Sequence, residues 1–189
     1  YQLQTSLALI HMPELEYWTF GTEVPQNQIA INFGAPGDRR GPNGKMWLEY
    51  PVVGGPSAKV NVTITPKTAA TFRLHSSSVQ SGDLKWIAAS GLQGVTRVNI
   101  AVEENGNYRV KLHFMEPENL KADQRVFDVA LQGKTMLRRL DIAQAATGIR
   151  RAIVREFNVT IKDKSLRIDL TPQGKKPPVL SGIEWHHKP

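Results

Sequence analysis

The chain has 189 residues, of which 40% are hydrophobic, so it is long enough for one sizeable core and too short for two full domains. It contains no cysteine, which excludes disulfides, thiolate catalysis and cysteine-ligated zinc. Its 24 Lys and Arg against 17 Asp and Glu give a formal charge of +7, which favours acidic partners but does not by itself define a basic patch.

Residues 1–28 differ in composition from the rest of the chain. An apolar stretch at 6–10 precedes the aromatic residues Tyr17, Trp18 and Phe20. Aromatic rings are costly to leave in water, so this segment is predicted to be an N-terminal arm or linker that packs on the body or on a neighbouring domain. Residues 29–189 then form the predicted domain. No apolar run approaches the roughly 20 residues that span a bilayer, so membrane insertion is not expected.

A segment rich in glycine and proline covers residues 34–55 and encloses a short predicted strand at 46–51. Long ordered loops on a rigid scaffold concentrate binding residues. Trp47 and Tyr50 are therefore the leading candidates to stack on a sugar ring, and the alternative is that both belong to the core. Trp86 and His75 rank next. His75 stands beside three serines after a predicted strand at 71–74, but without the glycine turn of a serine nucleophile, so a plain loop is predicted there.

Strand-like alternation of apolar and polar residues then recurs along the second half of the chain. Side chains alternate across a strand, so each run places its apolar residues on one face, whereas a helix could not bury residues in this alternating pattern on one side. Turn signals separate the runs at Gln132-Gly133, at 162–164 and at Asn105-Gly106, the last being a favoured hairpin dipeptide. The pattern predicts an all-β fold, an antiparallel β-sandwich, with runs at 108–114, 127–131, 157–161 and 166–170.

One short helix is predicted at 141–147, where Gly148 is the natural stop. Glu116 and Glu118 follow a strand end, but both lie on one loop and cannot flank a sugar from opposite sides as a glycosidase requires. His186 and His187 are adjacent and point in opposite directions in an extended chain, which argues against a metal site. The sequence therefore predicts a protein that is not an enzyme, with no cofactor, no metal and no nucleic-acid partner.

Several of these segments together resemble malectin-like domains. The resemblance is carried by residues 108–116, 125–133, 140–142 and 179–184, with 29–34 similar to the opening strand of the family. It runs from Gln28 to Trp185 and implies a β-sandwich of jelly-roll type, with carbohydrate bound by loops at one end in the best-known members. It also implies a bacterial type, whose members are accessory domains of larger proteins, and an extracellular or periplasmic location.

The sequence departs from the family pattern at the sugar site. Two consecutive aromatic residues of the family correspond to Glu118 and Asn119, which cannot stack on a sugar. An aspartate of the family falls near Lys175, and a third aromatic falls near Gly91. The resemblance therefore implies the fold but not the known disaccharide site.

Two hypotheses of function remain close to even. The first is a non-catalytic carbohydrate-binding accessory module that contacts a glycan through Trp47, Tyr50, His75, Trp86, Glu116, Glu118 and Asn119. The second is a structural or protein-interaction domain without a sugar site. A third alternative is an acidic polysaccharide bound by Arg39, Arg40, Arg138, Arg139 and Lys175.

Overall fold

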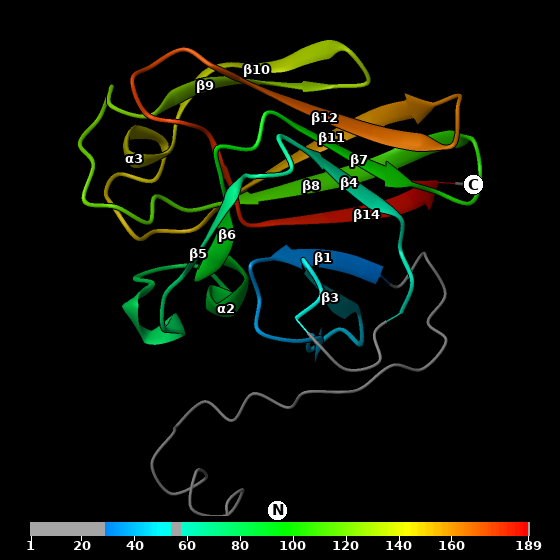
Figure 1. Ribbon diagram of the computed structural model, residues 1–189, viewed down its shortest axis with the longest axis horizontal. Coiled ribbons are helices and arrows are strands. Elements are labelled where there is room, and N and C mark those ends of the chain that lie inside the picture. The colour runs from blue at the N-terminus through cyan, green and yellow to red at the C-terminus, as the bar shows by residue number, and fades with distance from the viewer. Residues whose placement is uncertain (1–28, 54–57, 189) are drawn as a thin grey trace, which may run out of the picture.

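The structure is a computed structural model that describes residues 29–53 and 58–188. The predicted arm at 1–28 lies outside the described residues. The described residues form an all-β sandwich, as the alternating pattern predicts, and include three short helical segments (Figure 1).

Two large sheets form the body of the sandwich. The first has six strands in the order β11 (Ile153–Ile161), β8 (Gly106–Phe114), β14 (Gly182–Lys188), β1 (Ile29–Phe33), β3 (Met46–Tyr50) and β2 (Arg39–Arg40). The second has five, in the order β10 (Lys134–Asp141), β9 (Val126–Leu131), β12 (Ser165–Pro172), β7 (Arg97–Ala101) and β4 (Val62–Thr65). All strand pairs in both sheets are antiparallel except β1 with β3.

A smaller sheet of three strands lies beside the body, in the order β13 (Val179–Leu180), β6 (Ser90–Gln93) and β5 (Ala70–Arg73). The helical segments are the 3-10 turn η2 (Ser76–Ser78) and the single-turn helices α2 (Lys85–Ala88) and α3 (Ile142–Ala145). In Figure 1, β5 and β6 of this sheet lie beside α2, below α3 and the loops around it.

The core forms where the inward faces of the two large sheets meet. Val110, Leu112 and Phe114 of β8 are fully buried, and so are Phe127 and Val129 of β9 in the opposite sheet. The rings of Phe114 and Phe127 have centroids 6.0 Å apart, so they join the sheets directly. Complete burial of such a side chain stabilises the fold by about 1.5–3 kcal/mol, which makes this alternation the main determinant of the sandwich.

The predicted turns have different outcomes. Gln132 and Gly133 join β9 to β10 as a two-residue hairpin, and both have the positive φ angles, 52° and 77°, that this turn type requires. The prediction of a hairpin at Asn105-Gly106 is wrong, because this turn connects β7 to β8, and these strands belong to different sheets. A turn dipeptide reports that the chain reverses, but the pairing of the strands is decided by packing.

The predicted helix is confirmed as α3. Asp141 is its N-cap, with one carboxylate oxygen accepting a hydrogen bond of 3.1 Å from the backbone N–H of Gln144. Gly148 follows with a φ of 146°, a conformation that favours glycine.

Gly91, on β6, lets the strands of the smaller sheet pack closely. A Cβ atom at this position would lie 2.5 Å from the ring of Phe72 on β5 and 2.8 Å from the carbonyl oxygen of Leu180 on β13. No side chain fits here without displacing a neighbouring strand. Gly91 itself therefore cannot hold the aromatic residue that the malectin-like resemblance locates nearby.

We expect Gly91→Ala to lower the free energy of unfolding by about 1–3 kcal/mol, because the added methyl group overpacks the contacts of β6 with its two neighbours, β5 and β13. Urea denaturation measures the change. Gly41→Ala is the matched control, since its Cβ would come no closer than 3.2 Å to the end of the Asn43 side chain. Equal stability of the two variants would contradict this account of the small sheet.

Candidate functional site

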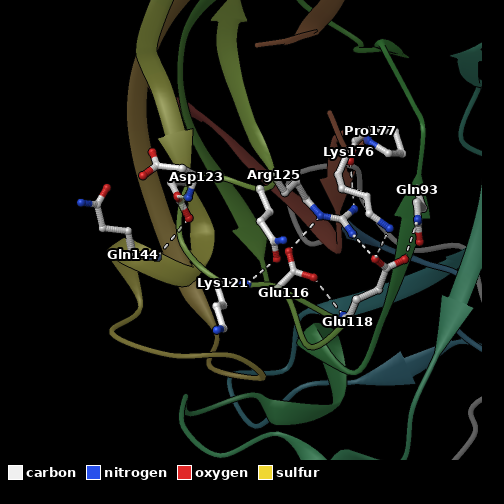
Figure 2. Close-up of polar contacts among 11 residues, drawn as sticks. Gln93, Glu116, Glu118, Lys121, Asp123, Arg125, Gln144, Lys176 and Pro177 are labelled. Atoms are coloured by element: carbon white, nitrogen blue, oxygen red, sulfur yellow. Dashed lines mark hydrogen bonds and ion pairs between the residues drawn. The ribbon is translucent and has the colours of Figure 1, made fainter. Parts of the chain in front are cut away.

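Three connections meet at one end of the sandwich, and polar side chains hold them together (Figure 2). The first connection is the segment 115–125 between β8 and β9. The second is the end of β6 at Gln93, and the third is the segment at Lys176 and Pro177 that precedes β13. We call this region the loop end.

A buried ion pair forms the centre of the loop end. The side chains of Glu116 and Arg125 are each only 1% exposed, and the Nε of Arg125 donates a hydrogen bond of 2.9 Å to Glu116. The Nη1 of Arg125 donates to the carbonyl oxygen of Pro177 at 2.9 Å. The other carboxylate oxygen of Glu116 accepts from the backbone N–H of Glu118 at 2.9 Å. Burial raises the pKa of Glu116, and Arg125 opposes that shift.

Glu118 lies at the rim of the same network, with 35% of its side chain exposed. It accepts hydrogen bonds from Gln93 at 3.1 Å and from Lys176 at 3.2 Å, and it lies 3.3 Å from Nη2 of Arg125. The hydrogen bond from Gln93 lowers the pKa of Glu118, partly opposed by burial and helped by Lys176. Glu118 therefore joins all three connections while keeping part of its carboxylate open to solvent.

A second contact fixes the far part of the segment 115–125. Asp141, the N-cap of α3, also accepts a hydrogen bond from the backbone N–H of Asp123. Figure 2 shows Asp123 and Gln144 at this contact, on the opposite side of the segment from Glu118. The segment is thus tied to β6 and the β13 approach at one side and to α3 at the other.

The structure places the candidate aromatic residues away from this network. Trp47 is only 1% exposed and packs with Ala30 and Ile87 on the outer face of the six-stranded sheet, beneath α2. Trp86 meets Trp47 edge-on with ring centroids 5.6 Å apart, and the guanidinium carbon of Arg39 lies 4.5 Å from the centre of the Trp86 ring. Trp47 has no ring face open to a sugar, and Arg39 covers one face of Trp86.

Of the remaining candidates, Tyr50 is half-buried and packs edge-on against Phe33, with centroids 5.9 Å apart. Burial raises its pKa. His75 is exposed and caps η2, as the predicted loop implies, because its ring nitrogen accepts from the backbone N–H of Ser77. Asn119 is exposed on the segment 115–125.

Of the seven predicted contacts, Glu116, Glu118 and Asn119 lie together at the loop end, whereas Trp47 and Trp86 pack against each other at a separate place. The structure adds Gln93, Arg125 and Lys176, which the sequence analysis did not select. No spacing signal could have found them, because each comes from a different connection and meets the others only after folding.

A second polar cluster lies beside Trp47 on the outer face of the six-stranded sheet. Glu184 binds His113 through one oxygen at 2.9 Å and Lys45 through the other at 2.8 Å. The centroid of the His113 ring lies 5.2 Å from that of Trp47. Burial alone would raise the pKa of Glu184, but the hydrogen bonds from His113 and Lys45 outweigh it and lower this pKa to about 2. Glu184 is therefore an anion that links β14 to β8 and to Lys45, the residue directly before β3.

The basic residues of the third hypothesis do not form one patch. Arg39 and Arg40 lie on β2, at the edge of the six-stranded sheet beyond β3, whereas Arg138 and Arg139 lie on β10, at the edge of the other sheet. Figure 1 shows β3 and β10 on opposite sides of the molecule. Among residues 29–53 and 58–188, no group of three His, Asp or Glu residues could hold a metal ion. No helix in that part of the chain is long and apolar enough to cross a membrane.

Comparison with known sequences supports the malectin-like resemblance. The family model of the malectin domain matches residues 95–183. A probable LRR receptor-like serine/threonine-protein kinase of Arabidopsis thaliana is 41% identical over 78 residues, which cover 38% of this chain and 8% of the kinase. A probable receptor-like protein kinase of the same plant is 29% identical over 147 residues, 70% of this chain and 18% of that protein. The chain thus spans less than a fifth of these relatives, and the bacterial type implied by the resemblance is contradicted by them.

Solved structures show the same fold at low sequence identity. The ANXUR2 extracellular domain of Arabidopsis thaliana superposes with a TM-score of 0.66 at 14% identity, covering 83% of this chain and 47% of that one. A chain from the structure of the plant peptide RALF23 in complex with FER and LLG2 gives 0.63 at 15% identity, covering 83% and 47%. The β-glucuronidase of Bacteroides uniformis gives 0.66 at 14% identity, covering 85% and 18%.

We expect Arg125→Met to lower the free energy of unfolding by about 3–5 kcal/mol, because it leaves the Glu116 carboxylate buried without a partner. Chemical denaturation measures the loss. The double variant Arg125→Met/Glu116→Leu should regain much of it, since neither charge then remains buried alone. The exposed pair of Arg109 with Glu156 provides the control, and Arg109→Met should cost less than about 1 kcal/mol. A loss of that small size in Arg125→Met would contradict a central role for the buried pair.

The lowered pKa of Glu184 predicts that the stability of the fold depends on pH. Its pKa in the folded protein is about 2, below its ordinary value of 4.5, so the stabilisation is complete above about pH 4.5 and is lost as the pH falls towards 2. The shift corresponds to about 3 kcal/mol at most, at about 1.4 kcal/mol per pKa unit. Denaturation series between these pH values should show a flatter profile for Glu184→Gln than for the wild type. An unchanged slope would show that Glu184 does not carry the effect, and Glu156→Gln is the exposed control.

Proposed function

We propose that the chain is a non-catalytic recognition module of a larger extracellular, receptor-like protein, and that its loop end contacts a protein or peptide ligand. The main observation behind this proposal is the network in which Arg125, Glu116 and Glu118 lock three connections into one surface. The relatives support the setting, because they are receptor-like kinases of which this chain spans a small part. Neighbouring domains of such a protein are further proposed partners.

The loop end suits recognition because it is ordered before any ligand arrives. Loops held by a rigid scaffold are the usual location of binding residues, and a surface that is already ordered loses less entropy on binding. At its rim, Glu118 presents a partly exposed carboxylate next to the ammonium group of Lys176, whose side chain is 45% exposed. Charges of both signs in a fixed arrangement favour a partner with a complementary charge pattern.

A peptide or protein fits this surface better than a sugar does. Sugar binding of the kind expected from the sequence needs a flat aromatic face, and the residues of the network supply none. Trp47, the leading candidate, is in a packed layer under α2, and Glu116 is sealed by Arg125. Glycan binding through Glu118 and Asn119 remains a prediction, carried only by their exposure at the loop end.

The same geometry supports a non-catalytic role. Glu116 faces Arg125 inside the protein and has no open path to a bound substrate. Glu118, two residues later, is held by three basic or amide donors. Neither carboxyl group is placed across a cleft from the other, as hydrolysis of a glycosidic bond requires.

The test uses the isolated chain with a random peptide-display library and a glycan array, both at physiological salt. Peptides selected on the wild type should bind Lys176→Glu at least about tenfold more weakly, because the reversed charge disrupts complementarity at the rim. Lys134→Glu makes the same charge change at the hairpin on the opposite end of β9 and should alter affinity by less than about twofold.

If the peptides bind both variants with the same affinity as the wild type, the assignment of the ligand to the loop end is wrong. Neutral glycans that bind and displace the peptides would replace the protein ligand with a carbohydrate at the same surface. Thermal melting of each variant distinguishes lost binding from lost fold.

A further inference from the structure

A polar groove of about 660 Å³ lies on the outer face of the five-stranded sheet, away from the loop end. It extends over the outward side chains of β7 and β12 and is bordered by the hairpin after β9 and the turn between β11 and β12. Its lining residues are Arg97, Asn99, Gln132, Thr160, Lys162, Asp163, Ser165 and Arg167. No function considered so far uses this surface.

Asp169 organises the two arginines of the groove. Its carboxylate oxygens lie 2.5 Å from the Nε of Arg97 and 3.3 Å from the Nε of Arg167. Arg97 pairs with Asp169 across the two strands, so all three side chains share the outward face of the sheet. Because both contacts use Nε, the Nη groups of the two guanidinium groups are left to donate hydrogen bonds to a ligand. The arginine side chains are 50% and 44% exposed, so a ligand can reach them.

The hairpin fixes the position of Arg167 from the other side. A Cβ at Gly133 would lie 2.8 Å from Nη2 of Arg167, so the absence of a side chain there lets the guanidinium group lie against the turn. The Gln132 amide accepts from the backbone N–H of Arg167 at 2.6 Å and donates to the carbonyl oxygen of Ser165 at 2.9 Å. Arg167 is therefore held by the hairpin as well as by Asp169.

We propose that this groove binds an anionic oligosaccharide, whose acidic groups contact Arg97, Arg167 and Lys162. Guanidinium groups bind carboxylate and sulfate with paired, charge-assisted hydrogen bonds. Asn99, Ser165 and Asp163 supply amide, hydroxyl and carboxylate partners for the sugar hydroxyls, and the hydroxyl of Thr160, which donates to Asn107 at 2.8 Å, keeps its acceptor capacity. The net charge of +7 favours the approach of such a chain.

This proposal concerns a different surface from the loop end and does not rest on the function proposed there. It also differs from the acidic-polysaccharide hypothesis drawn from the sequence, because none of its residues belongs to the clusters at 39–40, 138–139 or Lys175. Binding depends here on charge and hydrogen bonds, so affinity should fall steeply with salt.

Isothermal titration calorimetry of the chain with oligogalacturonate, its methyl ester and dextran sulfate tests the proposal. The methyl ester has the same sugar backbone without the charge. We expect oligogalacturonate or dextran sulfate to bind at low salt, the methyl ester to bind at least about tenfold more weakly, and the stronger of the two acidic probes to identify the acidic group. Failure of both acidic probes to bind, or equal binding of the ester, would overturn the proposal.

Arg97→Gln and Arg167→Gln localise the binding. Each should lower the affinity for the acidic ligand by about tenfold, as expected for the loss of a charge-assisted pair. Arg138→Gln makes the same charge change on β10, outside the groove, and should lower the affinity for the acidic ligand by less than about twofold. Equal weakening by all three variants would mean that only the overall charge attracts the ligand. Unchanged melting temperatures confirm that the variants fold.

Discussion

The loop end is organised by the cost of burying Arg125. A guanidinium group that is 1% exposed must have its charge neutralised and its N–H groups bonded, because an unpaired buried charge is among the most destabilising features that a fold can contain. Glu116 and Glu118 neutralise the charge of Arg125. Its Nε and Nη1 donate to Glu116 and to the carbonyl oxygen of Pro177, and its Nη2 has an ion-pair contact with Glu118 but no hydrogen bond; these partners come from two separate connections. Satisfying one buried cation therefore fixes the position of the segments 115–125 and 173–178. The polar surface above it follows from that constraint.

Local signals in the sequence were sufficient to identify β8, β9, β11, β12 and α3, but not to pair the strands. The alternation of β8, β9, β11 and β12 identified strands because one face of each is buried, and Asp141 with Gly148 marked the limits of α3. Those signals depend on neighbours along the chain. The partner of a strand depends on which apolar faces meet, so Asn105-Gly106 could not show that it joins two sheets. The network of Arg125 was hidden for the same reason.

Trp47 shows where reasoning from alternation fails. An antiparallel sheet commonly has one face in water, and Trp47 and Tyr50, three residues apart on one strand, point to opposite faces. In this fold β1 and β3 form a parallel pair, and α2 covers their outer face, so residues on both sides of β3 are buried from Met46 to Glu49. Parallel strands are usually covered on both faces. A four-residue helix is too short to give a periodic signal, and the sequence therefore could not show that Trp47 is enclosed.

The two surfaces of the molecule use charge in different ways. At the loop end, Glu116 and Glu118 pair with Arg125 and Lys176, and the buried cation Arg125 serves to hold the connections together. In the groove, a single carboxylate, Asp169, orients two arginines through their Nε atoms and leaves their outer N–H groups free of that contact. A basic net charge attracts acidic partners but does not by itself define a binding site. Because one carboxylate orients two guanidinium groups, their outer N–H groups form a directional set of hydrogen-bond donors.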